Sequence, residues 1–176
     1  MKLKLLLLVL FIMSFFVNSM QAQRPAEELL NDACEVAKTD QKNVMVIFTA
    51  TWCGWCKRML ANIKSEACEA MFERNYEIVT LDVMERGDKK ILENPGAYDL
   101  LVKYKAENSG IPFFLIFDAN SNFLEDSFND KGENLGCPAS FEEVADFKKI
   151  LLRTSSMTEK ELAVMESVFV LKEEKQ

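Results

Sequence analysis

The 176-residue sequence contains no histidine, only 6 glycines and 4 prolines, and no long run of basic residues. The absence of histidine excludes Ser-His-Asp and Cys-His hydrolases, histidine-ligated zinc and general-base schemes that use imidazole near neutral pH. The net charge of −7, without clustered Lys or Arg, argues against nucleic acid as a partner. Hydrophobic residues make up 49% of the chain, enough for one globular domain with a buried core plus extensions. Its five cysteines are the remaining chemical resource.

The N-terminal segment has the three-part layout of a secretory signal peptide, which we assign to residues 1–22. Two lysines precede an apolar run over residues 5–17, and a polar and small stretch follows. The apolar run is short for a transmembrane helix, so we expect cleavage near Ala22. Met20 fits the cleavage site poorly, which leaves an uncleaved membrane anchor as the alternative. We therefore expect an extracytoplasmic protein, periplasmic in a Gram-negative source, where thiol pairs can be oxidised.

Apolar spacing along the rest of the chain predicts alternating helices and strands. Continuous apolar runs at 44–50 and 112–117 are typical of strands buried on both faces. Residues 76–83 predict a strand beside the first one, and residues 123–128 a strand that returns as a hairpin. Helices are predicted at 26–38, at 53–63, from a cap at Ser65 to about Asn75, along Ala97, Leu100, Leu101 and Tyr104, after the capping box Ser140-Phe141-Glu142-Glu143, and at 158–174. This order implies an α/β fold, with a central mixed β-sheet flanked by helices on both faces.

Cys53-Gly54-Trp55-Cys56 lies where a buried strand is predicted to turn into a helix. Free amides and the helix dipole stabilise a thiolate at a helix N-terminus, which makes Cys53 the candidate nucleophile. We expect Cys53 to be partly exposed to solvent. Cys56 follows about one helical turn later, close enough to attack a mixed disulfide on Cys53, and is predicted to be the buried resolving thiol.

Two other uses of such a cysteine pair are possible but less favoured. Half of a four-cysteine zinc site requires a second close pair, whereas the other three cysteines are scattered. A purely structural disulfide would close a very short loop, so its entropic stabilisation of the fold is small. Among the other cysteines, Cys34 and Cys68 are interpreted as core residues. Cys137 lies in a Gly-Cys-Pro loop, and a reactive third thiol is its alternative interpretation.

Two motifs carry a resemblance to a known family. Trp52-Cys53-Gly54-Trp55-Cys56-Lys57 resembles the active-site segment of the thioredoxin superfamily, and Gly110-Ile111-Pro112 before an apolar strand resembles its second signature. The chain is also similar to secreted thioredoxin-like domains that resemble thiol:disulfide interchange proteins. The resemblance implies a thioredoxin fold over residues 26–152, beginning with an N-terminal helix and followed by a C-terminal helical extension over residues 153–176. It further implies that Cys53 and Cys56 are the redox pair, with a cis peptide bond before Pro112 beside them.

The same resemblance implies a substrate site and a reaction. Trp52 corresponds to the aromatic residue beside the redox pair, and the backbone at Ile111 corresponds to the edge that pairs with an extended substrate. Gly54, Trp55 and Pro112 complete the expected substrate-binding set, in which the two tryptophans form an exposed apolar platform. The implied protein is a thiol:disulfide oxidoreductase that reduces or exchanges disulfides in proteins or peptides. It needs no metal or organic cofactor, is kept reduced by a membrane-bound donor, and acts as a monomer.

The sequence departs from thioredoxins at two positions. Ile47 stands where they carry a buried aspartate that helps to move the proton of the resolving thiol, and Trp55 stands where they carry proline. Without that acid, Cys56 must lose its proton to water, to the substrate or to another carboxylate. Two rival functions are a non-catalytic thioredoxin-like binding module with a static disulfide, and a thiol copper carrier. Carriers of that kind rely on histidine, which this chain lacks.

Overall fold

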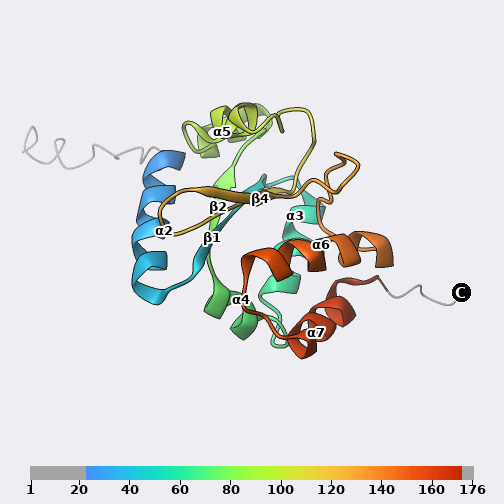
Figure 1. The fold of residues 1–176 in the computed structure, drawn as a ribbon. Coiled ribbons are helices and arrows are strands. Elements are labelled where there is room, and N and C mark those ends of the chain that lie inside the picture. Colours follow the sequence, from blue (N-terminus) through green and yellow to red (C-terminus); the bar gives the residue numbers. More distant parts are fainter. Residues whose placement is uncertain (1–22, 172–176) are drawn as a thin grey trace, which may run out of the picture.

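The computed structural model describes residues 23–171 and shows a four-stranded sheet with helices on both sides (Figure 1). The predicted signal peptide at residues 1–22 lies outside the described residues, as do residues 172–176 of the predicted C-terminal extension. Within residues 23–171, no helix has both the length and the apolar composition needed to cross a membrane. The elements in chain order are α2 (Ala26–Asp40), β1 (Asn43–Thr49), α3 (Gly54–Ile63), α4 (Glu69–Asn75), β2 (Tyr76–Asp82), η1 (Gly87–Leu92), α5 (Ala97–Lys103), β3 (Phe113–Phe117), β4 (Phe123–Asp126), α6 (Phe141–Thr154) and α7 (Glu159–Phe169).

The strands follow one another across the sheet in the order β2-β1-β3-β4. β1 pairs in parallel with β2 and antiparallel with β3, and β3 pairs antiparallel with β4. The inner residues of β1, 44–48, are all buried. Both faces of this strand are covered, which is why its sequence is a continuous apolar run. The predicted mixed sheet, and the predicted pairing of the first and second strands, are confirmed.

Alternating side chains of β1 contribute to two apolar cores on opposite faces of the sheet. Val44, Val46 and Phe48 pack on one face together with residues of α2 and α5. Met45 and Ile47 pack on the other face with residues of α3, α4, α6 and α7. Figure 1 shows α2 on one side of the sheet and α6 and α7 on the other. The helix α3, which follows the end of β1, is thereby fixed against the sheet.

The two C-terminal helices are capped and join the second core. Ser140 opens α6 with the predicted capping box, and Thr158 opens α7 in the same way. The sequence did not identify a packing partner for the last helix, and the structure shows that it packs on the core itself. Phe169 of α7 is fully buried, and its ring centre lies 5.4 Å from that of Phe147 in α6.

Several predicted boundaries are wrong. The helix predicted at 158–174 ends at Phe169. Ser65 does not cap the short helix, which begins only at Glu69. The Ser65 hydroxyl instead donates to the Asn62 carbonyl, 2.7 Å away in the last turn of α3. The hairpin strand β4 ends two residues earlier than predicted, because the Asp126 carboxylate accepts a hydrogen bond from the Phe128 amide and turns the chain.

Candidate active site

Cys53 lies between β1 and α3, at the position that caps the helix. The amide of Cys56 donates a hydrogen bond to Cys53 Sγ over 3.1 Å. This amide belongs to the first turn of α3, where backbone N–H groups have no partner within the helix. It is therefore in place to stabilise a negative charge on the Cys53 sulfur, together with the positive end of the helix dipole. The predicted placement of the motif at a strand-to-helix junction is confirmed.

Cys53 and Cys56 form a disulfide with Cα atoms 5.3 Å apart. Cys56 is fully buried, and its Sγ lies 4.0 Å from the carbonyl oxygen of Phe48. Only 3% of Cys53 is exposed, so the prediction of a partly exposed first cysteine is wrong. The cause is that Ala50 and Ile111 pack against the cysteine pair. A reacting sulfur must therefore approach through a small opening at Cys53, and Cys56 is out of its reach.

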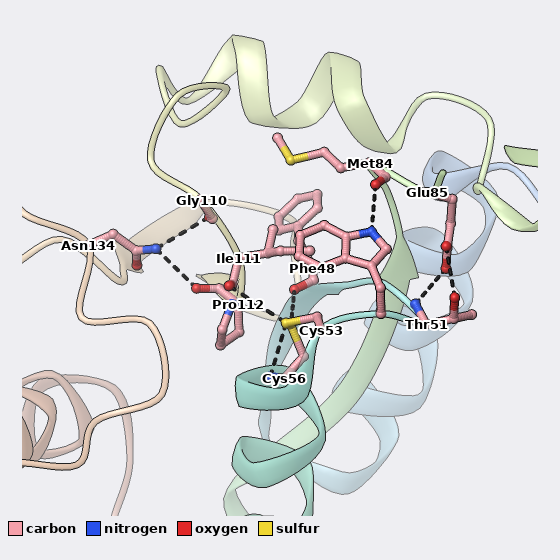
Figure 2. The surroundings of a disulfide bond; sticks show 11 residues. Phe48, Thr51, Cys53, Cys56, Met84, Glu85, Gly110, Ile111, Pro112 and Asn134 are labelled. Atoms are coloured by element: carbon pink, nitrogen blue, oxygen red, sulfur yellow. Dashed lines mark hydrogen bonds between the residues drawn. A yellow bond between two sulfur atoms is a disulfide. The ribbon is translucent and has the colours of Figure 1, made fainter. Parts of the chain in front are cut away.

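The Ile111–Pro112 peptide bond is cis and lies beside the disulfide, as predicted (Figure 2). The carbonyl oxygen of Ile111 is 3.6 Å from Cys53 Sγ, across a separation of 58 residues in the sequence. Gly110 precedes this bond with a φ of +78°, which favours glycine. The fold thus brings Ile111 and Pro112 against the first cysteine.

Asn134 fixes the loop that carries the cis bond, and sequence reasoning missed it (Figure 2). Its Nδ2 donates to the carbonyl oxygens of Pro112 at 3.0 Å and Ser109 at 3.1 Å. Its Oδ1 accepts from the Ser127 hydroxyl at 2.7 Å and the Gly136 amide at 2.9 Å. An isolated asparagine in a polar loop carries no sequence signal of such a role, because its partners come from distant segments.

Trp52 precedes Cys53, Trp55 lies between the two cysteines, and these tryptophans are 43% and 52% exposed. The indole N–H of Trp52 donates to the Met84 carbonyl oxygen over 2.8 Å, which fixes the ring. The Arg86 guanidinium lies 4.1 Å from the centre of the same ring, so this face is partly cationic rather than a purely apolar platform. At Gly54, an added Cβ would meet nothing within 4 Å, so the surface there is open.

Glu85 supports the segment before Cys53 and was also missed by sequence reasoning (Figure 2). Only 3% of it is exposed, and its carboxylate accepts from the amide of Thr51 at 2.5 Å and the Thr51 hydroxyl at 2.9 Å. Burial acts to raise the pKa of Glu85, but the two Thr51 hydrogen bonds and the charge of Lys89 hold that pKa below its ordinary value. A signal was available: the carboxyl ends of parallel strands share one sheet edge, which places the residues after β2 beside those after β1.

The other three cysteines are free and buried. Cys34 Sγ lies 3.2 Å from the Ser121 hydroxyl oxygen. Burial raises the pKa of Cys68, and it raises the pKa of Cys137 to about 11 although Arg58 opposes the shift. Cys137 is therefore a protonated thiol at neutral pH, which disfavours its interpretation as a reactive third thiol.

With Ile47 in place of an acid, β1 contains no acidic side chain. Ile47 is fully buried in β1 and pairs with Phe114 of β3 in the sheet register. Over residues 23–171, no three Cys, Asp or Glu side chains gather in a way that could hold a metal ion. The bonded cysteine pair can undergo thiol–disulfide exchange.

The chain is similar to a protein family and to several solved structures. A family model described as thioredoxin-like matches residues 26–119, which contain the disulfide and the Ile111–Pro112 bond. Similar solved structures include a disulphide isomerase from Xylella fastidiosa Temecula1, at 20% identity over 57% of this chain and 72% of that chain, with a TM-score of 0.48. A DsbH oxidoreductase is 21% identical over 77% and 90% of the two chains, with a TM-score of 0.45. The oxidised C-terminal domain of Neisseria meningitidis DsbD is 24% identical over 60% of this chain and 84% of that chain, with a TM-score of 0.41. No curated protein sequence matches the chain significantly.

Proposed function

Since the chain belongs to the thioredoxin-like family, we propose that it is an extracytoplasmic thiol:disulfide oxidoreductase that reduces or exchanges disulfides in other proteins. The observation that carries this proposal is the hydrogen bond from the Cys56 amide to Cys53 Sγ, at the N-terminus of α3 and within a bonded cysteine pair. This arrangement stabilises the thiolate of a reduced Cys53 and makes it the nucleophile. Because Cys56 is fully buried, it resolves the intermediate and does not meet the substrate.

The proposed cycle transfers two electrons and two protons to the substrate. The Cys53 thiolate attacks one sulfur of a substrate disulfide, so a bond to Cys53 forms, the substrate S–S bond breaks, and the leaving sulfur takes up a proton. Cys56 then loses its proton and attacks Cys53 Sγ, and the second substrate sulfur leaves and is protonated. The pair is left as the disulfide seen in the structure. A protein dithiol that supplies two electrons and two protons restores the reduced pair, and we propose that this donor is membrane-bound.

We assign the substrate contacts to Trp52, Gly54, Trp55, Ile111 and Pro112. The exposed tryptophans and the open surface at Gly54 support this assignment on one side of Cys53. The Ile111 carbonyl supports it on the other side, 3.6 Å from Cys53 Sγ. An extended substrate segment that pairs with the backbone at Ile111 would bring its own cystine to the small opening at Cys53.

The location and the organisation of the chain are part of the same proposal. The signal-peptide pattern at residues 1–22 supports an extracytoplasmic protein, which is periplasmic in a Gram-negative source. We propose that residues 26–152 form the redox domain, that residues 153–176 form a helical extension, and that the protein acts as a monomer. The burial of Phe169 supports an extension that is packed onto the domain.

A second candidate function is a thioredoxin-like binding module whose disulfide is static. The observation that favours it is the 3% exposure of Cys53, which limits access to the nucleophile. The two functions differ in the reduction potential of the pair, because structural disulfides have potentials below about −300 mV.

Insulin reduction with dithiothreitol as the donor tests the proposal. We expect the wild-type protein to accelerate insulin precipitation, Cys53→Ser to abolish the acceleration, and Cys137→Ser to retain it, since Cys137 is a buried free thiol. We also expect a reduction potential above about −300 mV. No acceleration by the wild type, together with a potential below that value, would establish the binding module instead.

A further inference from the structure

An arginine lies over each of the two exposed tryptophans: the Arg86 guanidinium is 4.1 Å from the centre of the Trp52 ring and the Arg58 guanidinium 6.0 Å from that of Trp55. Elsewhere in the described chain, cations such as Arg74, Lys148 and Arg153 form ion pairs with glutamates. Four separate lysines, Lys64, Lys103, Lys105 and Lys160, form none. The other described cations without an ion-pair partner lie in two segments beside the redox pair, 57–58 and 86–90. Their cations form no ion pair with a carboxylate of residues 23–171: Lys57, Arg58, Arg86, Lys89 and Lys90.

Two of these cations are held in fixed positions beside the nucleophile. The Arg86 guanidinium is stacked 4.1 Å from the centre of the Trp52 ring, and that ring is itself hydrogen-bonded to the Met84 carbonyl. Lys89 Nζ donates to the Thr51 hydroxyl over 3.1 Å, two residues before Cys53. Contacts of this kind reduce the freedom of long side chains, so the charges remain near the site of exchange.

The acids in and next to these segments, Glu85, Asp88 and Glu93, are fewer than their five cations, so the local charge stays positive. The Glu85 carboxylate is buried and bonded to Thr51. Asp88 is exposed, but it is one acid among Arg86, Lys89 and Lys90, which are exposed as well. A locally positive surface is therefore present in a chain whose net charge is −7.

We propose that the cationic-aromatic surface, formed by Trp52, Trp55, Lys57, Arg86, Lys89 and Lys90, binds polypeptides whose disulfide is flanked by Asp or Glu residues. This inference rests on the proposed function and names its substrate class. Carboxylates next to the substrate cystine are attracted to these cations, which have no ion-pair partner among residues 23–171, and this attraction speeds association. Segments rich in Lys or Arg meet like charges at the same place and are disfavoured.

Three synthetic peptides with the same intramolecular disulfide, flanked by Glu, Gln or Lys residues, test the inference. The second-order rate constant for oxidation of the reduced full-length protein is measured at pH 7 by the change in tryptophan fluorescence. At low salt we expect the Glu peptide to react about tenfold faster than the Gln peptide, and the Lys peptide to react most slowly. The difference should shrink at high salt, where surface charges are screened.

Charge variants show whether the named surface is responsible. Arg86→Gln combined with Lys90→Gln should lower the ratio of the Glu rate to the Gln rate by about threefold, whereas Arg86→Lys should largely keep it. The matched control is Lys64→Gln with Lys160→Gln, which removes the same charge at the far end of α3 and in the first turn of α7. Equal rates for the three peptides, or an equal fall of the ratio in the control, overturn the inference alone. No reaction with any of the peptides overturns the proposed function, and the inference with it.

Discussion

The Glu85 carboxylate accepts hydrogen bonds from both the amide and the hydroxyl of Thr51, although 34 residues separate the two in the sequence. Thr51 lies two residues before Cys53, so this contact ties the chain after β2 to the segment that carries the nucleophile. The amide of Glu85 in turn donates to the Glu93 carboxylate over 2.7 Å, which links η1 to the same point. The position of Cys53 thus depends on a buried ionised acid outside the motif.

We first predict that Glu85→Gln lowers stability in a pH-dependent way. The pKa of Glu85 is lowered in the folded protein, so its contribution is present above its ordinary pKa of 4.5 and is lost as the pH falls through the folded value. At pH 7 we expect a loss of about 1 kcal/mol in the free energy of unfolding, and a smaller difference from the wild type below pH 4.5. Urea unfolding of the wild type and of Glu85→Gln between pH 3 and 7 measures the two free energies of unfolding. If their difference does not change with pH, the prediction is contradicted.

Replacement of Ile47 tests the missing acid. Ile47→Asp should speed the attack of Cys56 on a mixed disulfide, because burial raises the pKa of a carboxyl and lets it accept the proton. It should also lower the free energy of unfolding by several kcal/mol, since Ile47 is fully buried. Ile47→Asn is the control, because it places a polar but non-titrating side chain there. Equal resolution rates in the two variants would show that proton removal from Cys56 is not limiting.

Asn134 is predicted to position the substrate edge. Asn134→Ala removes the donors to the Pro112 and Ser109 carbonyls, so we expect KM for peptide disulfides to rise more than kcat falls. Asn129→Ala is a matched control in the same loop. The Asn129 side chain forms hydrogen bonds only within its own turn, with Lys131 and Glu133. If the two variants have the same KM, Asn134 is merely a structural residue.

The last helix is predicted to be part of the folding unit. Phe169 is fully buried, so Phe169→Ala should lower the free energy of unfolding by about 3–5 kcal/mol. Phe141 is 82% exposed, so Phe141→Ala should change it by no more than about 0.5 kcal/mol. Denaturant unfolding of both variants measures these losses. If both variants lose equally little free energy of unfolding, α7 does not contribute to the stability of the domain.

The parts of the site that are local in sequence could be predicted. The apolar run of β1 followed by Cys53-Gly54-Trp55-Cys56 predicts a strand-to-helix junction, because both the burial pattern and the helix N-terminus are encoded within one segment. The pairing of β1 with β2 and the hairpin of β3 and β4 were also predicted, whereas the antiparallel pairing of β1 with β3 was not. The side-chain packing of the last helix is different, since its partner Phe147 belongs to another helix and no local pattern identifies it.

The parts that depend on contacts between distant segments could not be predicted. The expected exposure of Cys53 was wrong because Ile111, 58 residues later, covers its sulfur. Asn134 and Arg86 are ordinary polar residues in loops until the fold brings them to Pro112 and Trp52. Serine is a common helix-capping residue, but the Ser65 hydroxyl donates to the Asn62 carbonyl of the preceding helix, α3.

Trapping of mixed disulfides in the secretory compartment tests the central claim most directly. In the proposed cycle Cys53 forms the covalent intermediate and Cys56 breaks it, so Cys56→Ser should accumulate protein adducts that dithiothreitol releases. Cys53→Ser should accumulate few, because the remaining Cys56 thiol is fully buried. Equal adduct levels in the two variants, with insulin reduction unchanged from the wild type in both, would contradict the oxidoreductase and leave a thioredoxin-like binding module.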